Sequence, residues 1–167
     1  MSMKRIIPTV LAVLLLGHSA ALAAGARPQK APEATTQENA TKPLDAEGLA
    51  QYQVLQEYFE WQAALDDRFP SVFSRRVREE ETMAFLAARE TVSRRGQLER
   101  FRAAKVDLSG LVFKRITADP DLARIQVTGH YSFTVSPVVQ TVEEDALFVL
   151  LPEMGKWKIY ERREGWR

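Results

Sequence analysis

The stretch ARIQVTGHYSFTVS, at residues 123–136, alternates strictly between two kinds of side chain. Every odd position is apolar or small, and every even position is polar. This two-residue period is typical of a β-strand that buries one face, and the β-branched and aromatic residues agree with it. The stretch therefore predicts the central strand of an antiparallel sheet, with its odd positions in the core. Gly129, midway along it, predicts a bulge or a bend.

Three further strands are expected at about residues 108–117, 141–151 and 157–162. Asp119-Pro120-Asp121 and Glu153-Met154-Gly155 supply turn residues between them. Strands joined by such short connections form a meander, because consecutive strands then lie next to each other. We therefore expect a four-stranded antiparallel meander.

The residues before these strands have the apolar spacing of helices. Asp45 is a suitable N-cap for a long first helix, and Pro70 is expected to end it. A second helix is predicted at about residues 71–95, ended by Gly96, and a short third one at 97–105. Helices that precede an antiparallel sheet are expected to cover its apolar face. The predicted fold class is α+β, with one long and one or two shorter helices packed on the meander.

The first 23 residues have the features of a secretory signal peptide. Lys4 and Arg5 precede a short apolar run, and Ala21-Leu22-Ala23 fits a cleavage pattern. The apolar run is shorter than the roughly 20 residues that a membrane span needs. We therefore expect an exported protein, periplasmic or extracellular, with no stable membrane span after cleavage.

The rest of the chain divides into a linker and one domain. Residues 24–43 contain three prolines and no aromatic or large aliphatic side chain, so this linker is expected to be disordered. Residues 44–167 are expected to form a single α+β domain.

Composition excludes several kinds of chemistry. The chain has no cysteine, which rules out disulfides, thiolate nucleophiles and zinc–cysteine sites. Its net charge is +1, and removal of the signal peptide would leave 21 basic against 22 acidic groups. This balance gives no electrostatic reason to expect a nucleic acid or an anionic membrane as a partner.

Three segments together resemble the nuclear transport factor 2-like superfamily, which includes ketosteroid isomerases and scytalone dehydratase. They are Ala123-Arg124-Ile125-Gln126-Val127, Phe148-Val149-Leu150-Leu151 and Gly155-Lys156-Trp157-Lys158-Ile159. The resemblance covers about residues 44–162 and implies a cone-like fold with a pocket between helices and sheet. Because these motifs build the sheet, they imply no particular activity. Such cones often pair through the sheet, so a homodimer is a further expectation.

The resemblance suggests which residues would line such a pocket. The candidates are aromatic residues expected on the helix-facing side, and they are Tyr131, Phe133, Tyr52, Phe59 and Trp157.

No catalytic residue is predicted. His130 is the only histidine left after cleavage, which excludes a two-histidine metal site. Its even position in the strand predicts that its side chain points away from the helices. The resemblance to the isomerases implies a buried acid as proton shuttle. Glu143, Glu144 and Asp145 are candidates, yet acids in a run are expected to be solvated. No metal ion and no cofactor is expected.

Other charged residues have simpler interpretations. Asp66 and Asp67 follow the first helix, and one of them is expected to cap the turn at residues 69–71. The triplets at 75–78 and 79–81 place arginine and glutamate four residues apart, as on a solvated helix face. Arg162, Arg163 and Arg167 surround Trp166 and are expected to form a solvated tail.

Three functional hypotheses follow. The preferred one is an exported, non-catalytic binding or scaffold module that contacts a protein partner or takes a small apolar ligand in the cone. The second is an isomerase- or dehydratase-like enzyme that uses an inward-facing carboxylate. The third is a subunit of an envelope or secretion assembly that keeps its N-terminus as an anchor.

Overall fold

The computed structural model describes residues 45–165. The predicted signal peptide at residues 1–23 and the linker at 24–43 lie outside the described residues. The described part is α+β: helices come first, and an open antiparallel sheet of five strands follows. No described helix combines the length and the apolar character that a membrane crossing requires.

The long helix α2 spans Ala46–Ala64. The Asp45 carboxylate accepts a hydrogen bond of 2.6 Å from the Gly48 backbone N–H, so the predicted N-cap is confirmed. The helix does not continue to Pro70. It ends because Leu65 adopts a left-handed conformation, with φ 51°, and donates its N–H back to the carbonyl groups of the last turn.

We expect Asp45→Ala to lower the free energy of unfolding by about 0.5–2 kcal/mol, because the first turn of α2 loses its capping acceptor. Chemical denaturation followed by far-ultraviolet circular dichroism measures this loss. Asp121→Ala, in the exposed turn at residues 120–121, is the control and should change stability by less than about 0.5 kcal/mol. An equal loss in the two variants would contradict the capping role.

The second helical region is shorter than predicted. A 3₁₀ turn, η1, occupies Phe69–Val72, and α3 spans only Arg78–Arg94. The segment between them leaves the helical path because Phe73 forms a parallel bridge with Ile159 at the edge of the sheet. Gly96 has φ 66° and lies just beyond α3, as predicted.

The short helix α4 spans Leu98–Arg102 and therefore stops before the predicted boundary at residue 105. Its Phe101 is buried in the core, and Leu98 packs against it.

The arginine and glutamate triplets do not lie on one helix. Arg75 and Arg76 precede α3, so the predicted pairing within a helix is wrong for them. The Arg75 backbone N–H donates to the Glu153 carboxylate at 3.1 Å. The Arg76 guanidinium lies 5.9 Å from the centre of the Tyr160 ring. These arginines therefore join the segment before α3 to the last two strands.

Five strands form the sheet, one more than predicted. Three are long antiparallel neighbours in the order β3, β4 and β5, and β1 and β2 both pair with β3. Their bounds are Lys105–Asp107 for β1, Leu111–Asp119 for β2, Leu122–Val135 for β3, Val138–Glu153 for β4 and Lys156–Glu164 for β5.

The extra strand arises because the pairing along this side of β3 is interrupted beside Gly129. A Cβ atom at Gly129 would lie 2.2 Å from the Gly110 carbonyl oxygen, and Gly129 has φ 110°. Glycine is therefore required at Gly129 to let the backbones approach this closely. The approach separates β1 from β2, which lie one after the other along the same side of β3.

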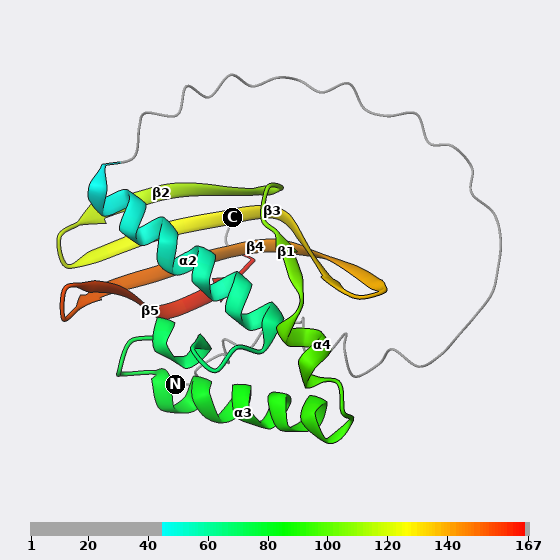
Figure 1. Cartoon of the computed structure of the whole chain (residues 1–167). Helices are drawn as coiled ribbons and strands as arrows, with labels where there is room; N and C mark the ends of the chain where they lie inside the picture. The colour runs from blue at the N-terminus through cyan, green and yellow to red at the C-terminus, as the bar shows by residue number, and fades with distance from the viewer. Residues whose placement is uncertain (1–44, 166–167) are drawn as a thin grey trace, which may run out of the picture.

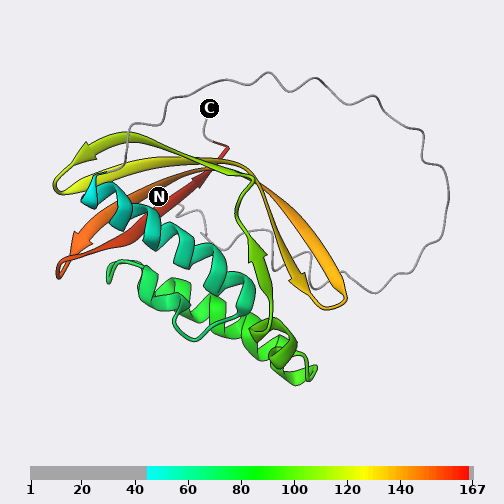
Figure 2. The same cartoon turned by 45° about the horizontal axis from the view of Figure 1, so that its top comes forward.

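The helices all lie on one side of the sheet, which we call the helix face (Figures 1 and 2). The opposite side is the outer face. The predicted parity of β3 is confirmed, because five of its seven odd residues are buried and His130 is exposed. The odd residues reach the helices: the Tyr131 ring lies 5.0 Å from that of Phe59 on α2. The buried odd residues of β3 are Ala123, Ile125, Val127, Tyr131 and Phe133.

Candidate functional site

Two charged side chains are buried on the helix face of the sheet. Glu144 on β4 is 3% exposed and Arg162 on β5 is 5% exposed. An Nη atom of Arg162 donates to the Glu144 carboxylate at 2.7 Å, and its other Nη donates to Glu164 at 2.7 Å. A buried ion pair of this kind is costly to desolvate, so each charge depends on the other.

Strand register places this pair inside the protein. Glu144 lies opposite Gly129, and Arg162 lies opposite Phe148, so both share the parity of the core residues. The prediction that the acidic run is solvated is therefore right for Glu143, which is exposed, and wrong for Glu144. Arg162 is likewise not part of a solvated tail, because β5 carries it under the helices.

Burial disfavours ionisation of the acidic groups around Arg162. Burial raises the pKa of Glu144, and the positive charge of Arg162 opposes this shift. Burial also raises the pKa of the Tyr58 and Tyr131 phenols, and Glu144 adds to both shifts. The Tyr58 hydroxyl is buried without a hydrogen-bond partner among the described residues. Both tyrosines therefore stay protonated, as hydrogen-bond donors close to a buried carboxylate.

Four of the five predicted pocket residues are buried in the core of the described structure. Phe59, Tyr131 and Phe133 are each at most 2% exposed, and Trp157 also belongs to the core. The rings of Tyr131 and Phe133 stack with their centres 6.5 Å apart. Only Tyr52 of the five is half-buried beside a small cavity.

That cavity has a volume of about 40 Å³ and lies between α2 and the strands β2 and β3. Gln51 is fully buried there, and neither polar atom of its side chain has a partner among the described residues. The sequence prediction missed this site, although a glutamine on the apolar face of the first helix was a signal for it. The cavity is lined by Gly48, Gln51, Tyr52, Leu55, Phe113, Arg115 and Ile125.

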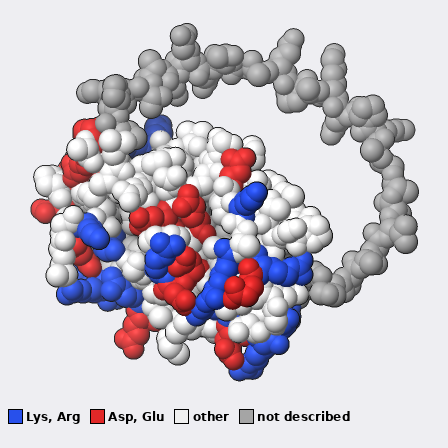
Figure 3. Space-filling view, viewed as in Figure 1, with Lys and Arg blue, Asp and Glu red and all other residues white. Residues whose placement is uncertain are grey.

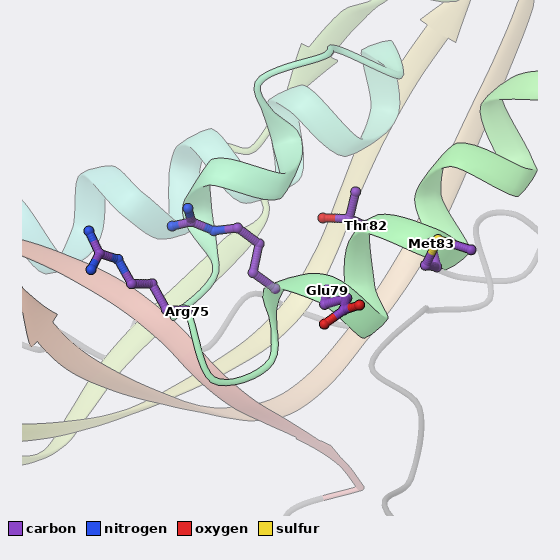
Figure 4. Close-up of a pocket in the computed structure, with 5 residues that line it drawn as sticks. Arg75, Glu79, Thr82 and Met83 are labelled. Carbon is purple, nitrogen blue, oxygen red and sulfur yellow. The ribbon is translucent and has the colours of Figure 1, made fainter.

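A second hollow, of about 310 Å³, lies at the start of α3. Figure 4 shows Glu79, Thr82 and Met83 on the first turns of the helix, with Arg75 on the segment before it. Arg78 also lines this hollow, but its guanidinium donates to the Phe73 carbonyl at 3.0 Å. Because this arginine is engaged and Glu79 adds a negative charge, the hollow is poorly suited to an anion.

The remaining predicted candidates lie at the surface. The Asp66 carboxylate accepts the Arg68 backbone N–H at 2.8 Å, and Arg68 lowers its pKa. This bond lies just before the turn at residues 69–71, which has no side-chain cap, so the predicted capping is wrong. Asp67 pairs with Arg89 on α3 at 3.0 Å. Within residues 45–165, no three histidine or carboxylate side chains are grouped closely enough to hold a metal ion.

The surface charges are mixed in sign. Figure 3 shows lysine and arginine interspersed with aspartate and glutamate over the helices.

Comparisons of the chain with models of known families, with characterised proteins and with solved structures find no match. The resemblance to the nuclear transport factor 2-like superfamily therefore stays a prediction.

Proposed function

We propose that the protein is an exported, non-catalytic binding module with a cone-like, nuclear transport factor 2-like arrangement, and that it acts through contact with a protein partner. The observation that carries this proposal is the filling of the helix face by the protein's own aromatic side chains. Tyr58, Phe59 and Phe148 are each at most 1% exposed, and their rings contact one another. A small apolar ligand would have to displace them, which favours a binding surface over an internal ligand.

The edge strand β2 is the surface that best fits such a partner. Among the described strands it pairs only with β3, whereas Phe73 covers part of the opposite edge at β5. Val112 and Ile116 on β2 are 62% and 42% exposed. An open edge with outward apolar side chains suits the addition of an extended segment from a partner, through main-chain hydrogen bonds and side-chain contacts.

A photo-crosslinking residue at Ile116 tests this assignment in the cells that express the protein. We expect illumination to give one discrete covalent adduct with a partner protein, visible as a band of higher mass. Leu86 on α3 is the matched control, because it is apolar and 45% exposed but lies away from the sheet. Absence of a discrete adduct at Ile116, or the same adduct at Leu86, would contradict β2 as the binding edge.

The buried carboxylate supports a second candidate, an isomerase- or dehydratase-like enzyme. Glu144 has a raised pKa and lies near two protonated tyrosines, a combination that suits a proton shuttle beside a hydrogen-bond donor. The two candidates differ in what they require of the pair. If Glu144 and Arg162 are structural, a variant that replaces both with apolar residues keeps the Ile116 adduct. The enzyme candidate requires the Glu144 carboxylate itself. It therefore predicts that this variant stays folded but loses catalytic activity.

A further inference from the structure

We propose that the cavity between α2 and β2 binds an uncharged carboxamide group, held by Gln51 and Arg115. This site differs from the β2 edge of the proposed function and does not depend on it. Its basis is a set of buried polar atoms that have no partner among residues 45–165 and that line one cavity.

Gln51 provides the first half of the site. Its side chain is fully buried, and both Nε2 and Oε1 lack a hydrogen-bond partner in the described part of the chain. Buried amide groups are almost always paired, because an unpaired one loses its bonds to water without replacement. A primary amide offers donors and an acceptor side by side. A ligand that satisfies Gln51 must therefore offer an acceptor and a donor in the same arrangement.

Arg115 provides a further donor and sets the charge of the site. One Nη atom lies 3.2 Å from Asp45 and the other lies 3.6 Å from Glu47. The Nε–H has no partner in the described structure. Because two carboxylates already surround this single positive charge, an anionic ligand would be repelled. An uncharged carbonyl oxygen can accept from Arg115 Nε without that penalty.

The size of the cavity selects a small group. One water molecule needs about 10–15 Å³, so a volume of about 40 Å³ has room for about three such atoms. The carbon, oxygen and nitrogen of a carboxamide fill this space. The rings of Tyr52 and Phe113 meet edge to face at 4.6 Å on one side of the cavity. With Leu55 and Ile125 they provide apolar contacts for an attached alkyl group.

Acetamide is the probe for this site, in a titration of the isotope-labelled protein followed by the amide resonances. We expect saturable shifts at Gln51 and Tyr52 with a millimolar dissociation constant, because so few atoms make contact. Gln51→Leu keeps the size of the side chain and removes the unpaired amide, so it should fold, and it should weaken acetamide binding at least tenfold. Gln53→Leu is the control on the same helix, because Gln53 is exposed and bonded to Glu57 at 3.1 Å; it should leave binding unchanged.

Two further probes distinguish the source of the group and its charge. N-methylacetamide that binds as well as acetamide points to a backbone amide, and preference for acetamide points to a primary amide; both results support the proposal. Acetate should bind at least tenfold more weakly than acetamide. Equal binding of acetate, equal binding of acetamide to the Gln51→Leu variant, or acetamide shifts that do not saturate would overturn the proposal. A crystal soaked in acetamide that shows only water on Gln51 would overturn it as well.

Discussion

Val127→Asp is expected to lower the free energy of unfolding by more than about 4 kcal/mol, or to prevent folding altogether. Val127 is 0% exposed, and it lies between Phe113 on β2 and Ala146 on β4. A carboxylate at this position is buried without a partner, which is among the most damaging changes that a core can undergo. Urea denaturation followed by tryptophan fluorescence measures the loss.

Thr134→Asp is the matched control on the same strand. Thr134 has the opposite parity, so its side chain lies on the outer face, and its partner on β1 is Lys105. A carboxylate there stays solvated and faces a positive charge, so we expect a loss below about 1 kcal/mol. A large loss at both positions would mean that the outer face is covered in solution, as in the homodimer that the family resemblance implies. Sedimentation of the unmodified protein would then show a dimer.

The face of β3 could be predicted because its signal is local. A strand needs only alternate residues to bury one side, and residues 123–136 alternate without exception. The N-cap of α2 has the same local origin, since the Asp45 carboxylate reaches the first turn of its own helix. The outer-face position of His130 follows from the same parity.

The candidate sites could not be predicted in the same way, because their side chains meet across strands. Glu144 shares the parity of Phe148, which hinted at burial, but the adjacent acids suggested a solvated run. Its partner, Arg162, lies near the C-terminus, and only the register of β4 with β5 brings the two together. The cavity at Gln51 similarly requires the placement of α2 against β2, which no sequence period encodes.

Helix ends were predicted poorly for a related reason. Pro70 disfavours a helix before it, but the chain had already left α2 at Leu65. The bridge between Phe73 and Ile159 then holds the start of the predicted second helix at the edge of the sheet, so these residues are not α-helical. At Phe73 a tertiary contact overrode the local preference for helix, whereas α2 ends through the left-handed conformation of Leu65 itself.

Glu144→Leu is expected to lower the free energy of unfolding by about 3–5 kcal/mol, because it leaves Arg162 buried without its main counter-charge. The double variant Glu144→Leu/Arg162→Met removes both charges and keeps apolar volume. It should recover most or all of the loss, because apolar residues of similar volume replace a buried ion pair at little or no cost in stability. A control pair lies on the outer face, where Arg163 and Glu161 are 2.7 Å apart and partly exposed; breaking it should cost less than about 1 kcal/mol.

The pH dependence of the Arg162→Met variant gives the sharpest test of the pair. Burial already raises the pKa of Glu144, and Arg162 is what opposes the shift, so its removal raises this pKa further. The folded variant then holds a proton that the unfolded chain releases above a pKa of about 4.3. Its stability should therefore fall as pH rises from about 4.3 towards the folded pKa, and it should fall more steeply than in the unmodified protein. Denaturation midpoints of the two proteins, measured from about pH 4 to about pH 8, provide the comparison. Parallel pH profiles for the two proteins would mean that Glu144 is solvated. That result would contradict the assignment of Glu144 and Arg162 as a buried ion pair.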